Sequence, residues 1–384
     1  MRMRVLHVIT ALGVGGAERM LLKLLGARAL SGVDQHVVAM LPGGAMAGPM
    51  RATGAPVETL DFLGGVPVVG AGARLALFAR RLSPQIVQGW MYHGNLGATL
   101  ARAALGRSVP LVWGVRQSLP SLEGENGFAR AGIRLNKALS GCPDRLLFNS
   151  KTSLDQHRAF GFDMRHAQYL PNGFDTSAFS PDPEMRARWR AAWGADEGVV
   201  VFGLLARYHP AKDHAGFLQA ARQVAEARPQ VRFVMAGTGV DGDNPDLARA
   251  IAEAGLGTKV QLLGERRDVA AILSGLDVYV SSSSRIEAFS NSVGEALSCA
   301  LPCVVTDVGD SPQVVGEAGR VVPPLDPVAL ANAMVALVDV GSEARAALGR
   351  RARQRMVSDF GIEAVAKRYA DLYAELAAGQ QAPA

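Results

Sequence analysis

The chain has 384 residues, 20% of them charged and 49% apolar, and its 40 Lys and Arg against 35 Asp and Glu give a net charge of +5. This length and composition are ordinary for a globular protein of two domains. The three cysteines form no C-x-x-C pair and no run of 18 apolar residues lacks a charge, which argues against a disulfide framework, a zinc site and a membrane-spanning helix.

The first predicted element is a strand, "RVLHVIT" (residues 4–10), followed by the glycine-rich "GVGGAE" and a helical pattern. Gly13 and Gly15 match the first two glycines of the dinucleotide fingerprint G-x-G-x-x-G, but Glu18 stands at the third. This departure counts against a nicotinamide site. Two interpretations remain: a tight turn without a ligand, and a turn whose backbone approaches a phosphate.

Short β-rich runs alternate with helical patterns through both halves of the chain. Near-continuous apolar strands in this alternation predict doubly wound parallel α/β sheets, and the series occurs twice. The stretch 170–189 is rich in Pro, Gly and Asp and is interpreted as an inter-domain connection. An amphipathic helix is predicted near the C-terminus, over 362–378.

The first half offers one candidate acid–base residue. His93 follows the strand "QIVQGW", and ligands of α/β sheets bind at the carboxyl ends of strands. His93 is therefore either a group that orients or deprotonates an acceptor hydroxyl, or a hydrogen-bonded structural histidine.

The second half carries the most informative stretch, residues 281–319. A strand ends near Ser281 and a helix is predicted to start near Ser292, so the backbone N–H groups of the first helical turn form an anion site. Glu287 in the loop and Glu295 in the first turn are natural acceptors for sugar and ribose hydroxyls. The residues whose N–H groups would form the anion site are Asn291, Ser292 and Val293.

Two cations precede this stretch. Arg207 and Lys212 lie in the loop after the strand "VVVFGLL", and both side chains are suited to phosphate. The alternative without a ligand is a solvated loop with two ordinary surface charges. A ligand that combines phosphates with hydroxyls explains the cations and the glutamates together.

Four features occur in order along the chain: "GVGGAE", "LPNGFDTSAF", the Arg207-x4-Lys212 pair, and the Glu287-x7-Glu295 pair that runs into "NSVGEALSCALPCVVTDVGDSPQVVGEAG". Together they resemble glycosyltransferase family 4 over nearly the whole chain. The resemblance implies the GT-B fold, an α/β architecture of two Rossmann-like doubly wound domains that face a cleft. The implied domains are 1–172 on the acceptor side and 173–361 on the nucleotide-sugar side, with the final helix 362–384 packed back on the first.

The resemblance also implies roles. Glu295 would bind the ribose of a nucleotide sugar and Glu287 the transferred sugar. Arg207 and Lys212 would neutralise the leaving diphosphate, where fixed cations lower the barrier. The further donor contacts that it implies are Gly15 and Gly16, across the cleft, and Gly237 and Arg266.

Two other patterns in the sequence match motifs of other enzyme classes. Asp241 and Asp243 have the D-x-D spacing of metal-dependent glycosyltransferases of another fold, but they lie in the polar turn "GVDGDNPD". Glu287 and Glu295 also suggest a glycosidase pair. Both lie on one short loop–helix segment, which makes placement on opposite sides of a scissile bond difficult.

On the acceptor side, Arg116 stands where many members of the family have a histidine. That histidine's role is therefore not carried over. Arg116 is expected to hold a donor or acceptor oxygen and not to act as a base.

The charge is unevenly distributed, because residues 1–180 contain 19 Lys and Arg against 10 Asp and Glu. The basic half predicts an acidic partner, such as an anionic membrane surface bearing a lipid-linked acceptor, whereas high genomic use of arginine would explain the excess without a partner. No nucleic-acid-binding module occurs. The candidate membrane-facing residues are Arg80 and Arg81, in the run "ARR" (79–81), and Arg130, Arg134 and Lys137.

The sequence therefore predicts a cytoplasmic retaining glycosyltransferase that moves a sugar from a UDP- or GDP-sugar to a hydroxyl of a lipid-linked glycan and requires no metal or other cofactor. The alternatives are a nucleotide-sugar epimerase or a phosphorylase on the same fold, and a non-catalytic nucleotide-sugar-binding protein. Whether nucleotide release requires an acceptor discriminates among them.

Overall fold

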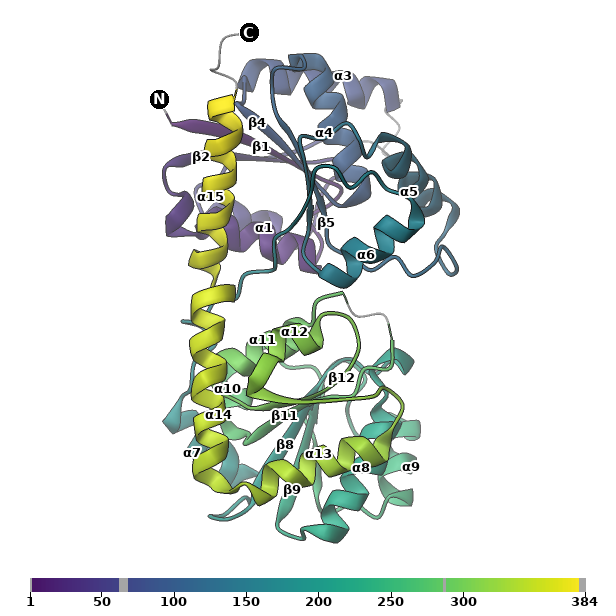
Figure 1. The fold of residues 1–384 in the computed structure, drawn as a ribbon, viewed down its shortest axis with the longest axis vertical. Helices are drawn as coiled ribbons and strands as arrows, with labels where there is room; N and C mark the ends of the chain where they lie inside the picture. The colour runs from purple at the N-terminus through teal and green to yellow at the C-terminus, as the bar shows by residue number, and fades with distance from the viewer. Residues whose placement is uncertain (1, 62–67, 286–287, 380–384) are drawn as a thin grey trace. The chain divides into compact units, whose positions relative to one another are not determined.

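The computed structural model describes residues 2–61, 68–285 and 288–379. The chain divides into two compact units, the first comprising Met1–Gly173 with Ile362–Ala384 and the second Phe174–Gly361. Each unit contains one parallel sheet with helices on both faces (Figure 1). The predicted class, two doubly wound parallel α/β sheets, is confirmed.

The first unit holds a seven-stranded sheet in the order β3-β2-β1-β4-β5-β6-β7, with every pairing parallel. Its elements are β1 (Met3–Ile9), α1 (Gly16–Gly26), η1 (Arg28–Leu30), β2 (Val33–Ala39), α2 (Ala47–Ala52), β3 (Val57–Thr59), α3 (Val68–Leu82), β4 (Ile86–Trp90), α4 (Met91–Leu105), β5 (Leu111–Val115), α5 (Gly127–Leu139), β6 (Arg145–Phe148), α6 (Lys151–Phe160), β7 (Ala167–Tyr169) and α15 (Ile362–Gly379).

The second unit holds a six-stranded sheet in the order β10-β9-β8-β11-β12-β13, again all parallel. Its elements are α7 (Pro183–Ala192), β8 (Val200–Leu205), η2 (Pro210–Lys212), α8 (His214–Ala227), β9 (Val231–Ala236), α9 (Pro245–Glu253), β10 (Val260–Leu262), α10 (Val269–Gly275), β11 (Val278–Ser281), α11 (Asn291–Ser298), β12 (Cys303–Thr306), α12 (Ser311–Val315), η3 (Gly316–Ala318), β13 (Gly319–Val322), α13 (Pro327–Asp339), α14 (Gly341–Arg355) and the π-helical turn η4 (Met356–Phe360).

Each sheet separates two hydrophobic cores, which explains why its central strands are apolar at nearly every position. In β8, Val201 and Leu205 pack on one face, whereas Val200, Phe202 and Leu204 pack on the other. In a strand successive side chains point to opposite faces, so burial of both faces requires a continuous apolar run.

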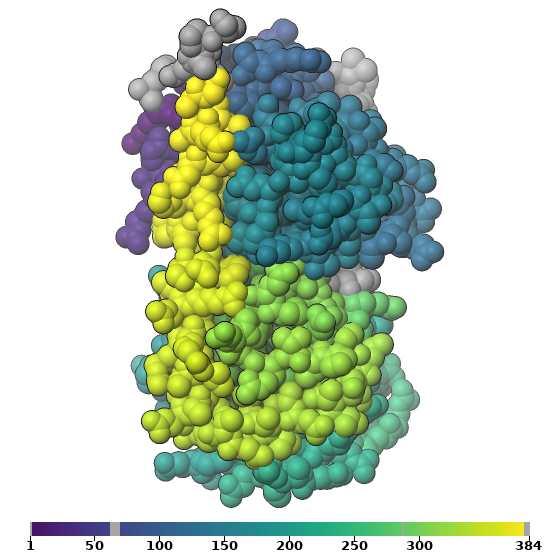
Figure 2. All heavy atoms as spheres, in the orientation of Figure 1, coloured from purple at the N-terminus to yellow at the C-terminus, as the bar shows by residue number. Residues whose placement is uncertain are grey.

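The C-terminal helix α15 completes one core of the first unit. Val365, Tyr369 and Tyr373 are fully buried there, in the same cluster as Val5 and Trp90 of the central strands. The outward side of α15 lies on the surface of the unit (Figure 2), where Lys367 and Arg368 are exposed.

The stretch predicted as a connection, 170–189, is only partly irregular. Its second part forms the first two turns of α7, because Asp182 accepts a hydrogen bond from the Met185 N–H and Pro183 occupies the first turn. These are common features of a helix N-terminus.

No single helix in the described ranges is long and apolar enough to cross a membrane. The pair Pro327–Asp339 and Gly341–Phe360 meets the length and composition test only when taken together, and it bends by 108° at the break.

Candidate functional site

The strand order of each sheet reverses beside its first strand, which is where open α/β sheets bind ligands. In the second unit this point lies between β8 and β11, and in the first between β1 and β4. Most of the candidate residues from the sequence lie in the loops or helices that directly follow these four strands.

In the second unit, the loops after β8 and β9 are joined through their main chains. The Tyr208 N–H donates to the Thr238 carbonyl at 2.8 Å, and the Gly237 N–H donates to the Gly264 carbonyl at 2.8 Å. Gly237 has a φ of +149°, and a Cβ there would stand 2.2 Å from the Ala206 carbonyl oxygen. Glycine is required at this position for the two loops to meet.

The loops after β8, β11 and β12 are joined by hydroxyl groups. Ser282 Oγ donates to the carbonyls of Lys212 at 2.8 Å and Asp213 at 3.2 Å. The Ser284 N–H donates to the Ala211 carbonyl at 2.9 Å, and Thr306 Oγ1 donates to the Ser283 carbonyl at 2.6 Å. We call this set of joined loops (206–213, 237–240, 282–285 and 306–310) the laced edge.

The two predicted cations both lie on the laced edge. Arg207 is exposed and makes no hydrogen bond or ion pair within the described ranges. Lys212 is half-buried at the end of η2, and its carbonyl is held by Ser282. Lys212 also contributes to lowering the pKa of the adjacent His214 to about 4, although burial of that histidine is the larger cause.

Helix α11 begins at Asn291, one residue before the predicted start, and follows Ser290, whose side chain makes no capping hydrogen bond. Asn291 and Ser292 are half-buried, whereas the Val293 side chain is fully buried in the core. Glu295 is the fifth residue of the helix, so its predicted place in the first turn is wrong by one position. A helical side chain leans toward the N-terminus, which brings the half-buried Glu295 back toward the helix start.

Glu287 lies outside the described residues, so its predicted role stays a prediction. Arg266 is described, and its guanidinium forms a paired contact with Asp268 at 2.8 Å through both Nε and Nη2. It also lies 5.6 Å from the Trp189 ring centre. The Arg266 side chain is therefore engaged within its own unit, and its predicted contact with the donor stays a prediction.

The D-x-D pattern forms a turn. Asp241 Oδ1 accepts a hydrogen bond from the Asp243 N–H at 3.1 Å, which fixes the Asp241 carboxylate to its own loop. In the ranges that the structure describes, no group of three or more His, Cys, Asp and Glu side chains is arranged to hold a metal ion.

The structure adds one residue that sequence reasoning missed. Asp310 is fully buried at the carboxyl end of β12, and its N–H donates to the Ala288 carbonyl at 3.1 Å. This contact ties the loop after β12 to the residues just before α11. The signal available in the sequence was an acidic residue in a glycine-containing loop after a predicted strand, "TDVGD".

In the first unit, the glycine-rich turn leads directly into α1. Gly15 is the residue before the helix, and a Cβ there would stand 2.4 Å from Glu18 Oε2. Gly16, the first helical residue, is exposed. The glycine at position 15 thus makes room for the Glu18 carboxylate over the positive end of the helix.

His93 lies in the first turn of α4, just past the carboxyl end of β4, because β4 passes into α4 without a loop. Met91, at the junction, has a φ of +63°, which is uncommon for a residue with a side chain. The His93 ring stacks on Phe128 at 4.3 Å between ring centres, and its buried Nε2 has no hydrogen-bond partner in the described chain. Burial lowers the pKa of His93, so the neutral form is favoured.

Arg116 is engaged with its own unit. One Nη donates to Asn172 Oδ1, the other donates to the Tyr369 hydroxyl at 2.5 Å, and the guanidinium lies 4.8 Å from the Trp90 ring centre. The side chain therefore joins β4, the end of the first unit's main segment and α15. Its Nε is buried without a partner among the described residues.

Two family models match this chain. Residues 14–178 match Glycosyltransferase Family 4, and residues 198–339 match Glycosyl transferases group 1. A mannosyltransferase of lipopolysaccharide core biosynthesis, LpsB of Rhizobium meliloti, is 27% identical over 226 residues, covering 55% of this chain and 64% of that protein. The Escherichia coli UDP-Gal:alpha-D-GlcNAc-diphosphoundecaprenol alpha-1,3-galactosyltransferase is 27% identical over 213 residues, or 54% of each chain.

The matched stretches thus span between about half and two thirds of these two relatives. Among solved structures, HepE of Anabaena in complex with UDP is similar with a TM-score of 0.84 at 20% identity, covering 97% of this chain and 100% of HepE. At this identity the likeness concerns the fold. On the family models and the two doubly wound sheets together, the chain belongs to glycosyltransferase family 4 and has the GT-B fold.

Proposed function

We propose that this chain is a retaining glycosyltransferase that transfers a sugar from a nucleoside diphosphate sugar to a hydroxyl acceptor. The observation that carries the proposal is the laced edge, which includes Arg207 and Lys212 and is joined through the Asp310 N–H to the Ala288 carbonyl just before α11. Cations and helix N–H groups suit a diphosphate, and Glu295 suits ribose hydroxyls. The UDP bound to HepE supports a uridine nucleotide as one donor class.

The proposed reaction needs no covalent enzyme intermediate. The acceptor oxygen forms a bond to the anomeric carbon on the face from which the diphosphate leaves, and the departing diphosphate oxygen takes up the hydroxyl proton. Arg207 and Lys212 stabilise the negative charge that develops on the leaving group. Glu287 binds the transferred sugar, and neutral His93 orients the acceptor hydroxyl.

The proposed acceptor is a glycan on a membrane lipid. One of the two relatives described above is named for a diphosphoundecaprenol-linked acceptor. In the first unit, α5 exposes Phe128 and Leu135 (65% and 48% exposed) together with Arg130 and Arg134. Apolar side chains flanked by arginines on one helix suit the interface of an anionic membrane.

The test is nucleotide release measured with and without acceptor. The chain is incubated with UDP- or GDP-sugars, alone and with a lipid extract that contains polyprenyl diphosphate-linked glycans, and the anomeric configuration of the product is read by NMR. Acceptor-dependent release with retained configuration is expected. Release of isomerised sugar without acceptor would indicate an epimerase, dependence on inorganic phosphate a phosphorylase, and binding without release a non-catalytic protein.

A further inference from the structure

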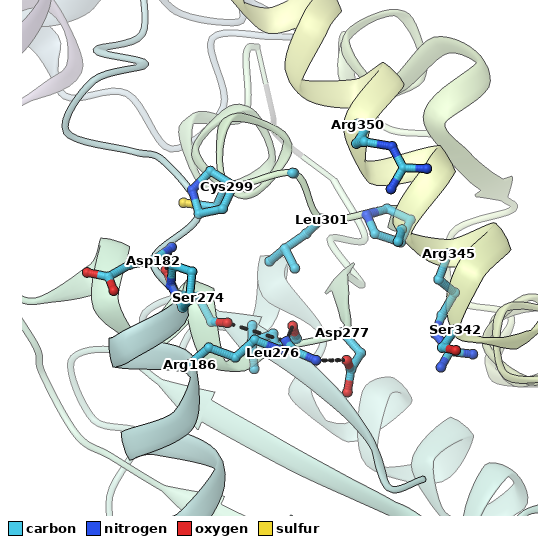
Figure 3. A pocket seen from close by; sticks show the side chains of 15 residues that line it. Asp182, Arg186, Ser274, Leu276, Asp277, Cys299, Leu301, Ser342, Arg345 and Arg350 are labelled. Atoms are coloured by element: carbon cyan, nitrogen blue, oxygen red, sulfur yellow. Dashed lines mark hydrogen bonds and ion pairs between the residues drawn. The ribbon is translucent and has the colours of Figure 1, made fainter. Parts of the chain in front are cut away.

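A cavity of about 470 Å³ lies in the second unit, away from the laced edge. It is lined where β11 and β12 begin, by Asp277 and Pro302, and by residues of α7 and α14 (Figure 3). The laced edge lies where the strands end. Because all strands of this sheet run parallel, the cavity and the laced edge occupy opposite edges of the sheet.

The walls of the cavity are mainly apolar, as is usual for small-molecule sites. The apolar lining comes from Pro181, Pro183, Leu276, Leu301, Pro302 and Ala346. The volume falls within the range of about 300–1,000 Å³ that is typical of ligand pockets.

Three arginines line the cavity, Arg186, Arg345 and Arg350, and only the first forms an ion pair within the described residues. Arg186 pairs with Asp277 at 2.6 Å, and the neighbouring Arg190 pairs with the same carboxylate at 2.8 Å. Asp277 is therefore shared between two guanidinium groups. It leaves no full counter-charge for Arg345 or Arg350.

Arg345 donates through Nη1 to the carbonyls of Leu337 and Val338 at 3.0 Å, and the structure gives its Nε and Nη2 no partner among the described residues. Burial lowers the pKa of Arg345, Asp277 raises it, and Arg186 and Arg190 lower it. Arg345 is thus a partly desolvated cation beside other cations, where an anion would be stabilised.

Arg350 is exposed and has no hydrogen bond or ion pair within the described chain. The other carboxylate of the lining, Asp182, lies at the far end of the cavity from Arg345 and Arg350 (Figure 3) and accepts the Met185 N–H. Asp182 is therefore distant from the arginines on the α14 side, and Asp277 acts on Arg345 while it is paired with Arg186 and Arg190.

From the apolar walls and the two uncompensated arginines on α14, we infer that this cavity is a second ligand site, which takes a phosphate monoester carried on a small apolar body. A phosphate monoester bears nearly two negative charges at neutral pH and has three acceptor oxygens, enough for both guanidinium groups. The apolar body fills the space between α7 and the loop before β12.

The test uses calorimetry on the whole chain with phenyl phosphate as the probe. Phenyl phosphate is expected to bind more tightly than inorganic phosphate, and phenol is expected not to bind. R350Q should weaken binding of phenyl phosphate by tenfold or more, because it removes a cation without breaking a described contact. A346E should weaken it at least as much, since it adds a carboxylate to the wall.

The matched control is R351Q, which removes an exposed arginine from the same helix outside the cavity lining. Its affinity for phenyl phosphate should stay within twofold of the unsubstituted chain. Equal affinities of R350Q and R351Q, or displacement of phenyl phosphate by saturating UDP, would overturn the inference. UDP binding measured separately in R350Q keeps this outcome distinct from failure of the proposed function.

Discussion

The two sheets have the same arrangement around the point of strand reversal, yet their ligand-facing edges are held in different ways. The laced edge of the second unit is held by main-chain contacts together with the hydroxyl groups of Ser282 and Thr306, and it requires glycine at position 237. The edge of the first unit also has main-chain contacts between its loops, such as the Met40 N–H to the Ile9 carbonyl, and contacts of large side chains add to them. Arg116 joins Asn172, Tyr369 and Trp90, and His93 stacks on Phe128.

The two edges therefore differ in how strongly they depend on particular side chains. Contacts between main-chain groups do not depend on the identity of most side chains, so the laced edge can be retained while surrounding residues vary. The edge of the first unit depends more on the side chains of Arg116 and His93. Under the proposed function, this contrast fits a shared donor chemistry and a variable acceptor.

The largest effect is expected from the cations of the laced edge. R207A and K212A should each lower kcat by about 10²–10³, the usual cost of removing a group that stabilises charge in the transition state. R267A, which removes an exposed arginine of the same unit, should change kcat by less than twofold. The measurement is steady-state kinetics with the full donor.

A D241N/D243N variant should also stay close to the unsubstituted rate, because Asp241 is used in its own turn. Strong inhibition by EDTA that Mn²⁺ reverses, and that D241N/D243N abolishes, would contradict both the cation assignment and the proposed mechanism.

Acid should destabilise the first unit more than the second. Burial lowers the pKa values of His7 and His157 in the first unit, and of His214 in the second, to about 4. In the unfolded chain these histidines bind a proton near pH 6.5. Above that pH the free energy of unfolding has its full value. It falls as the pH drops from 6.5 toward 4, by up to about 3 kcal/mol per histidine.

Hydrogen exchange of the two units at pH 7 and pH 4.5, corrected for intrinsic exchange rates, measures this difference. A loss of protection that is equal in both units, or larger in the second, would show that the buried histidines do not control acid stability.

Arg116 should matter for the stability of the first unit and not for the donor. R116A removes two hydrogen bonds and a cation–π contact, and it should lower the unfolding free energy of that unit by about 2–4 kcal/mol. Urea unfolding followed by exchange in the first unit checks this. Y369F, which removes only one of the contacts, should cost about 1 kcal/mol. UDP affinity should stay within twofold, and a tenfold loss would reassign Arg116 to the donor site.

The two glutamates should separate nucleotide binding from turnover. E295Q should weaken UDP binding about tenfold, the equivalent of about 1.4 kcal/mol, because the proposed contact with the ribose of UDP does not require the transferred sugar. E287Q should leave UDP affinity nearly unchanged and lower kcat, since its contact requires the transferred sugar. Calorimetry with UDP and kinetics with the full donor measure the two quantities, and equal losses of UDP affinity would remove the distinction.

The smallest effect per residue is expected at the membrane. Each basic residue near an anionic surface contributes about 1 kcal/mol, so R130S and R134S should each reduce sedimentation with anionic vesicles. K137S should have less effect, because Lys137 Nζ lies 5.0 Å from the Phe160 ring centre of its own unit. Absence of binding to anionic vesicles at low salt would favour a soluble acceptor.

The central strands can be predicted from the sequence because both of their faces are buried, which leaves a continuous apolar run. Strands β3 and β7, of three residues each at an edge of the sheet, lack such a run: β3 has one buried side chain, Val57, and β7 has none.

The candidate residues can be predicted in their order along the chain, but not in their contacts. Arg116 lies 253 residues from Tyr369 in sequence, and no local sequence pattern predicts their hydrogen bond. The start of α4 directly after β4 is also not predictable, because Met91 adopts a backbone conformation that its side chain disfavours. Tertiary packing decides both features.

The placement of α15 in the first core has a consequence for synthesis of the chain on the ribosome. The residues that line this core near the N-terminus, such as Val5 and Trp90, are made before the second unit, whereas Tyr369 and Tyr373 are made after it. At translation rates of about 5–20 residues per second, the gap lasts roughly 10–40 s. During that interval the second unit can fold while an apolar face of the first unit is still exposed to solvent. A chaperone can bind the nascent chain at this exposed face.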